Sequence, residues 1–303
     1  MISSPFMGYL AMLIAAFLWS IAVVTFKSVS KNLSPFLINS LKNTIALFFF
    51  CILFYFFEFS FWYSDLSIRG YYIIIISGIL GMGIGDSLFV YSLSKIKANQ
   101  VAIIDTFAPV MNYILSFFIL GTILSSYQTF GSVIVIIAIL FVTYENRIDN
   151  NQKQTDKRGV VFQILATFVS CLGIVILKPV LNKVGGSIEA QLWITAFRLI
   201  PGVVIAWVIF LCQKDSLQLL LRLKNKIIIK KMIFGTFVGT FLALSFWIVG
   251  YANIEEPPIA SIIGQSAVIF ITIFSSIFLK EKITKTKIGS IILAIIGVII
   301  IVT

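Results

Sequence analysis

GYYIIIISGILGMGIGDSLFVYSL, residues 70–93, is an apolar stretch in which Asp86 is the only charged side chain. A helix that spans the hydrocarbon core of a bilayer needs roughly 20 consecutive, mostly apolar residues. The stretch meets this requirement, and the basic residues Lys95 and Lys97 that follow it are typical of a loop at the membrane surface. It therefore predicts a membrane-spanning helix and indicates that the chain uses lipid as its solvent.

The rest of the chain repeats this pattern. Of its 303 residues, 59% are hydrophobic and 12% are charged, and the mean hydropathy of +1.06 is too high for a water-soluble globule. Since strands of a membrane barrel would instead alternate in polarity over about ten residues, we expect an all-α membrane protein with ten transmembrane helices. The predicted helices cover residues 8–26, 35–57, 70–93, 98–120, 127–144, 159–177, 188–212, 228–251, 257–279 and 283–302.

Basic residues are distributed unevenly between alternate loops. The loops after the second, fourth, sixth and eighth predicted helices contain only Arg69, Lys178 and Lys183, whereas the other loops contain most of the Lys and Arg residues. Because such residues are enriched in cytoplasmic loops, we expect the basic loops to be cytoplasmic and both termini to be extracytoplasmic, in the inner (plasma) membrane. The net charge of +11 is then explained by contact with anionic membrane lipids, and no nucleic-acid partner is expected.

The two halves of the chain resemble each other at a fixed spacing. A shift of 158 positions places Gly81 on Gly239, and near the first and sixth predicted helices a shift of 151 positions places Lys27 on Lys178. A repeated unit with five helices enters the membrane in the opposite direction the second time, because five is an odd number. The pattern therefore predicts two inverted five-helix repeats.

We place these repeats at residues 1–145 and 159–303, with a polar cytoplasmic linker at residues 146–158 between them. Inverted repeats are typical of secondary transporters, in which the substrate binds near the bilayer midplane between the repeats. The organisation of the chain thus indicates transport by alternating access.

FLKEKITKTKIGSIILAIIGVIII, residues 278–301, resembles the closing signature of the EamA-type members of the drug/metabolite transporter superfamily. Glu281 and Gly289 occupy matching places in that signature, while Lys280 replaces the usual glycine. ILGTILSSYQTFGSVIVIIAI, residues 119–139, resembles the same element in the first half, with Thr122 where an acidic residue is usual. Residues 16–27 and 85–110 are also similar to the family, so that the resemblance covers most of the chain.

The resemblance implies export or exchange of small metabolites such as amino acids, with neither ATP nor a metal required. Because the chain has no histidine, no metal-ligand spacing and only short loops, we expect neither an enzyme nor a cofactor. The superfamily also includes transporters of nucleotide sugars, other nucleotide-related solutes and cationic drugs. We therefore expect an amino-acid-like small-molecule substrate and a monomer or homodimer. The alternatives are a transporter of nucleotide-related or cationic drug-like solutes, or a lipid flippase.

Four ionisable side chains stand out well inside predicted helices, namely Lys42, Asp86, Asp105 and Arg198. Such residues are costly in lipid and usually face a bundle interior or a wet cavity. At about 1.5 Å of rise per residue, the first three lie at a similar depth, roughly 10–12 Å from a cytoplasmic loop. Because nearby charges titrate together, Asp86 and Asp105 are candidates for proton coupling. The alternative is that these charges tie helices together as ion pairs or caps.

Arg198 lies deeper, and its planar guanidinium could hold a substrate carboxylate or phosphate. The alternative is a pair with Glu189 or with a backbone carbonyl. Polar faces and buried tryptophans complete the candidate site, which contains neither a catalytic residue nor a metal ligand. The predicted substrate-binding residues are Trp19, Asn39, Lys42, Asp86, Asp105, Arg198, Trp247 and Gln265.

Overall fold

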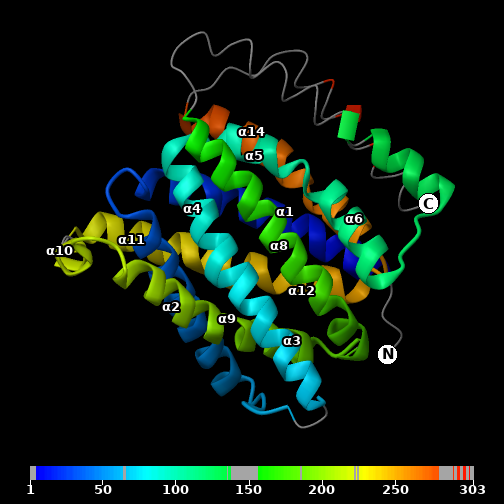
Figure 1. Ribbon diagram of the computed structural model, residues 1–303, viewed down its shortest axis with the longest axis horizontal. Coiled ribbons are helices and arrows are strands. Elements are labelled where there is room, and N and C mark those ends of the chain that lie inside the picture. Colours follow the sequence, from blue (N-terminus) through cyan, green and yellow to red (C-terminus); the bar gives the residue numbers. More distant parts are fainter. Residues whose placement is uncertain are drawn as a thin grey trace.

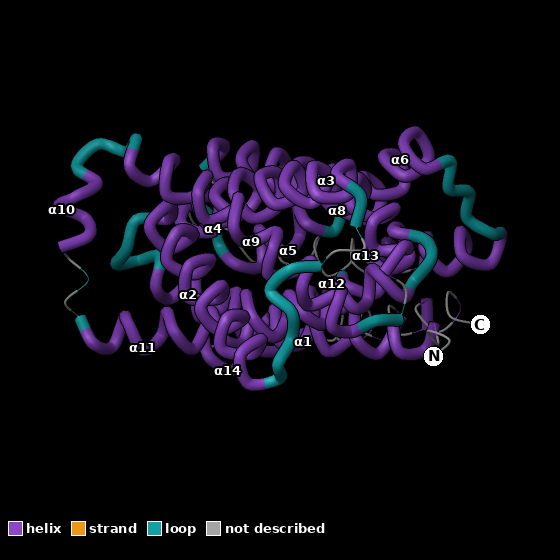
Figure 2. The backbone as a smooth tube through the Cα atoms, turned by 90° about the horizontal axis from the view of Figure 1, so that it is seen from below, coloured by secondary structure: helices purple, strands orange, loops and turns teal. Residues whose placement is uncertain are grey.

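The computed structural model consists of helices and their connecting loops, with no strand among the residues that it describes (Figures 1 and 2). It describes residues 5–63, 66–134, 136–137, 156–184, 186–221, 223, 225–279, 289, 292–293, 296–297 and 300. The predicted linker at 146–158 lies outside these residues except for its last three, and the predicted helix at 283–302 lies largely outside them.

The first half begins with the long helices α1 and α2, Pro5–Val29 and Pro35–Phe56. The third predicted span is one continuous stretch made of three parts: α3 (Ile68–Gly78), the π-helix η1 (Ile79–Gly85) and α4 (Asp86–Lys95). It is followed by the shorter helices α5 (Ala98–Asp105) and α6 (Ala108–Leu120), and the backbone is again helical over 126–134.

The second half also starts with two long helices. It begins with α8 (Lys157–Val184) and α9 (Ile188–Leu211), and a short helix α10 (Ser216–Leu221) follows. The next stretch again contains a π-helix, η2 (Thr236–Ala243), between α11 (Lys226–Gly235) and α12 (Leu244–Asn253). Two further helices, α13 (Pro257–Gly264) and α14 (Ser266–Leu279), follow.

Seven of the described helical stretches are long and apolar enough to cross a membrane. They are Phe6–Val29, Pro35–Phe56, Ile68–Lys95, Lys157–Val184, Ile188–Leu211, Lys226–Asn253 and Pro257–Phe274, and Ala108–Leu120 is a shorter apolar helix. The prediction of an all-α protein that crosses the membrane several times is thus confirmed for the described residues. The count of ten stays a prediction.

The predicted helix at 98–120 is not continuous. It is interrupted at Thr106 and Phe107, and Pro109 occupies the first turn of α6, where the N–H that proline lacks is not needed. Pro109 therefore begins a second helix inside the predicted span. The predicted helix at 257–279 is interrupted in the same way at Gln265.

Each π-helical stretch packs against helices of the other half. η1 lies between α8 and α9, while η2 lies against α1 and α2. Glycines make this approach possible, because a Cβ atom on Gly78 would lie 2.3 Å from the backbone oxygen of Arg198. Likewise, a Cβ atom on Gly239 would lie 2.4 Å from the Cβ of Ala22. The two halves are therefore interleaved.

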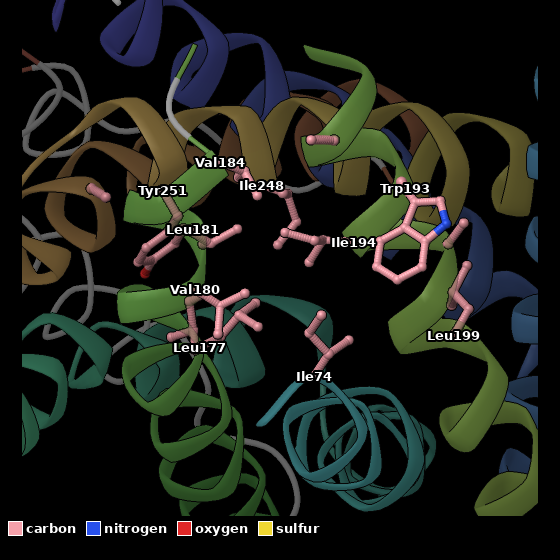
Figure 3. Close-up of a cluster of buried hydrophobic side chains, with 14 of the residues drawn as sticks. Ile74, Leu177, Val180, Leu181, Val184, Trp193, Ile194, Leu199, Ile248 and Tyr251 are labelled. Atoms are coloured by element: carbon pink, nitrogen blue, oxygen red, sulfur yellow. The ribbon is translucent and has the colours of Figure 1, made fainter. Parts of the chain in front are cut away.

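Figure 3 shows the packing of buried apolar side chains that fixes α3, α8, α9 and α12 relative to one another. Ile74 faces Leu177 and Val180 of α8, and Ile194 lies near Ile248. Large apolar side chains are exposed elsewhere, including Tyr55 (76%) and Phe118 (79%), as expected for a surface that faces lipid. The interior of the bundle, in contrast, contains polar and charged groups.

Candidate functional site

A cavity of about 230 Å³ lies in the centre of the helix bundle. Helices of both halves contribute to its wall, including α1, α2, α4 and α5 from the first and α8, α9, α12 and α13 from the second. Seven of the eight predicted site residues line it: Trp19, Lys42, Asp86, Asp105, Arg198, Trp247 and Gln265. The topology therefore brings together residues that are far apart in the sequence.

Lys42 and Asp86 form an ion pair that connects α2 with α4. The Lys42 side chain is 1% exposed, and its Nζ also donates to Oδ1 of Asn43 at 2.8 Å. Asp86 is 17% exposed and borders the cavity. The structural alternative considered for these charges, a pair that ties helices together, is thus realised for Lys42 and Asp86.

Asn39 lies behind this wall and is not among the residues that line the cavity. Its Nδ2 donates to Oγ of Ser87 at 2.8 Å and to the carbonyl of Met82 at 3.1 Å, and Asn43 donates to the same carbonyl at 2.9 Å. Buried backbone carbonyls must find a donor, and these two amides supply it at the wide turns of η1. Asn39 therefore holds the π-helix in place beside Asp86.

Asp105 is the last residue of α5, next to the interruption before α6. Its Oδ1 accepts hydrogen bonds from Oγ1 of Thr167 at 2.6 Å and from Nε2 of Gln163 at 2.9 Å, both on α8. Among the described residues, Asp105 has no ion-pair partner. The three charges predicted at one depth are consequently divided between an ion pair and a separate carboxylate.

Arg198 is 1% exposed and borders the cavity from α9. Within the described part of the chain, none of its three guanidinium nitrogens has a hydrogen-bond partner. The guanidinium lies over the ring of Trp247, with Cζ 5.9 Å from the ring centroid, and Asp86 acts on it electrostatically. Glu189, considered as a partner, instead accepts a hydrogen bond from the backbone of Ser60.

A buried arginine without hydrogen bonds is unusual, because removing a charge from water costs several kcal/mol unless a partner compensates for it. The guanidinium offers five N–H donors in a planar arrangement that matches a carboxylate or a phosphate. Arg198 is therefore positioned to bind an anionic group in the cavity.

Aromatic side chains form much of the remaining wall. Trp19 of α1 packs against Phe89, with ring centroids 5.5 Å apart, and Trp247 of α12 packs against Tyr251 at 4.5 Å. The hydroxyl of Tyr251 accepts a long hydrogen bond, 3.4 Å, from Asn112 of α6. These rings leave an apolar surface beside the charged groups.

Sequence reasoning missed Gln163 and Thr167, which are uncharged and hold Asp105. They lie four residues apart within the apolar span at 159–177 and hence on one face of α8. A polar pair at this spacing is the signal that could have identified them. Among the described residues, no group of three or more His, Cys, Asp or Glu side chains is arranged to hold a metal ion.

Known proteins resemble this chain both in sequence and in fold. The sequence model of the EamA-like transporter family matches residues 6–144 and 157–303. A protein of Archaeoglobus fulgidus named "Uncharacterized transporter" is 24% identical over 295 residues, which cover 95% of both chains. One solved crystal structure has a TM-score of 0.74 at 11% identity, covering 97% of this chain and 95% of that one.

Proposed function

We propose that this chain, which belongs to the EamA-like transporter family, is a secondary transporter of small, carboxylate-bearing metabolites, with amino-acid-like solutes as its substrates. Its family and the name of its relative support a membrane transporter. The finer proposal, on the substrate and the mechanism, rests on the central cavity.

The buried guanidinium of Arg198 is the observation that carries this proposal. A substrate carboxylate would supply the hydrogen-bond acceptors that the described residues do not provide. The cavity volume of about 230 Å³ lies below the roughly 300–1,000 Å³ of pockets for drug-sized ligands, which favours a small metabolite over a nucleotide sugar or a large drug. Trp19 and Trp247 would contact the apolar part of the solute.

We further propose that the two halves are inverted five-helix repeats, joined by the linker at 146–158, which rock against each other around the cavity. The family matches at residues 6–144 and 157–303 support this, as do the matching positions of the two π-helices. Since each π-helix packs against the other half, a relative movement of the halves would change the wall of the cavity.

We propose that transport takes place across the cytoplasmic membrane, with the basic loops on the cytoplasmic side, and that it is linked to protons through Asp105. Asp86 is engaged by Lys42, whereas the charge of Asp105 has no ion-pair partner in the described part of the chain. Of the two candidates for proton coupling, the geometry favours Asp105.

Counterflow in proteoliposomes tests the proposal. Proteoliposomes that contain the purified protein are loaded with each solute of a panel. The panel contains the twenty common amino acids, nucleotide-related solutes and cationic drugs. We expect saturable exchange of amino acids by the wild-type protein and no such exchange by Arg198→Gln. The control Lys183→Gln, which alters an exposed lysine on α8, should retain the exchange. The proposal would be contradicted if the protein exchanged only nucleotide-related solutes or only cationic drugs. It would also be contradicted if the protein moved a labelled phospholipid without exchanging any solute.

A further inference from the structure

Gln163 presents an unused oxygen beside Asp105. The side chain is 1% exposed and lines the cavity, and its Oε1 has no hydrogen-bond partner among the described residues. Its Nε2 donates to the carboxylate of Asp105, and this fixes the orientation of the amide, because the reversed amide would place two acceptor oxygens against each other. The unpartnered atom of Gln163 is therefore an acceptor.

The cluster around Asp105 has more acceptors than donors. The two side-chain hydrogen bonds that reach the carboxylate, from Gln163 and Thr167, both end on Oδ1. The hydroxyl of Thr167 is used in its bond to Asp105 and cannot serve Gln163 Oε1. A group that offers several N–H donors and a positive charge would satisfy the second carboxylate oxygen and the amide oxygen together.

The charges that line the cavity give a second, independent argument. Lys42 and Asp86 neutralise each other, which leaves the positive charge of Arg198 and the negative charge of Asp105 without ion-pair partners in the described chain. A simple anion would compensate only Arg198, and a simple cation would compensate only Asp105. A zwitterion compensates both and adds no net charge to a buried site.

We propose that Asp105 and Gln163 form a subsite for the primary ammonium group of the substrate, while Arg198 binds its carboxylate. This deepens the proposed function and rests on it, since it assumes that the cavity is the transport site. An ammonium group has three N–H donors, and the two free oxygens would accept two of them. The subsite makes the amino group of the substrate a requirement for tight binding.

The test compares matched ligands on the same protein. Affinities are measured for L-leucine, L-phenylalanine and the other common amino acids, and for the 2-hydroxy acid that corresponds to each, in which a hydroxyl replaces the ammonium group. The wild-type protein is expected to prefer the amino acid by about tenfold or more. Asp105→Asn and Gln163→Leu should each remove most of this preference by weakening amino-acid binding, with hydroxy-acid affinity changed less than twofold.

Lys183→Gln is the control variant, because Lys183 lies on the same helix as Gln163, is exposed and is not among the residues that line the cavity. It should retain the wild-type preference. Since both ligands are measured on one preparation, a loss of folded protein lowers the number of sites and leaves the ratio of affinities unchanged. Gln163→Met, which keeps the side-chain length, replaces Gln163→Leu if the latter yields no folded protein.

Two results would overturn the inference. If Asp105→Asn weakened the binding of the amino acid and of its 2-hydroxy acid equally, the cluster around Asp105 would have a purely structural role. The second result is amino-acid binding that requires Na⁺ in the wild type but not in Asp105→Asn. It would show that the free oxygens of Asp105 and Gln163 bind an inorganic cation. Failure of the proposed function is distinguishable from both, because the wild-type protein would then bind neither member of any pair.

Discussion

Lys27 and Lys178 make equivalent contacts in the two halves of the chain. The Nζ of Lys27 donates to the carbonyls of Leu93 and Ile96, at 2.6 and 2.7 Å, where α4 ends. The Nζ of Lys178 donates to the carbonyls of Tyr251 and Ile254, at 2.7 and 2.5 Å, where α12 ends. These acceptors are related by the same shift of 158 positions that aligns Gly81 with Gly239. The relationship supports the proposed repeat at the level of individual atoms.

The first prediction concerns these lysines. Lys178→Met keeps the apolar stem but leaves two carbonyls at the end of α12 without their donor, so we expect a loss of about 1.5–3 kcal/mol in stability. Lys27→Met should have a smaller effect, because Lys27 is less buried. Thermal unfolding in detergent measures both, with Lys183→Met, at an exposed position of α8, as the control that should remain unchanged.

The second prediction concerns the contact between η2 and α1. In Gly239→Ala the new Cβ would lie 2.4 Å from the Cβ of Ala22, so the helices must separate, and we expect destabilisation by about 1–3 kcal/mol. Gly70→Ala in α3 is the matched control, since its Cβ would lie 3.5 Å from the nearest side-chain atom. Alanine favours the helix, so this control should be neutral or stabilising. Equal melting temperatures of the two variants would contradict the close packing.

The fold could be predicted in part. The apolar spans and the glycines of 78–85 stand out in the sequence, because lipid excludes charge and only small residues allow close helix contact. The interruption at Thr106 and Phe107 could not be placed, since Pro109 is compatible both with a bend and with the start of a new helix. The π-helices give no sequence signal, because one widened turn changes the apolar pattern very little.

The third prediction concerns the ion pair. Asp86→Asn leaves the buried charge of Lys42 without a charged partner and should destabilise the protein by about 3–5 kcal/mol. Lys42→Met should cost less, because Asp86 is partly exposed to the cavity. The double variant should be more stable than the sum of the single effects implies. Strict additivity in a double-mutant cycle of unfolding free energies would show that the pair contributes no coupling.

The fourth prediction concerns pH. Protonation of Asp105 removes the negative charge that attracts the substrate ammonium, so amino-acid affinity should fall as the pH is lowered through its titration. The helices α8 and α14 both pack against α5. The Cys171 thiol of α8 lies close enough to Asp105 to interact with it electrostatically, whereas α14 has no charged residue. Asp105→Asn should abolish this dependence, and Cys171→Ala should preserve it. A pH profile that is unchanged in Asp105→Asn would exclude the proton linkage.

The candidate site was predictable where it is charged. Arg198 and Asp105 stand out because ionisable residues are rare in membrane-spanning helices, and both border the cavity. The pairing of these charges depends on the rotation of each helix about its own axis. This rotation cannot be read directly from the sequence. Gln163 and Thr167 were missed because uncharged polar residues are common in such helices as interhelical hydrogen-bond partners.

The most direct test is the melting temperature of the wild-type protein and of Arg198→Met, each with and without a bound amino acid. We predict that Arg198→Met melts higher than the wild type without solute, because an uncompensated buried charge has been removed. We also predict that the solute raises the melting temperature of the wild type and not that of the variant. A variant that melts lower than the wild type and is still stabilised by the solute would contradict the binding of substrate by Arg198.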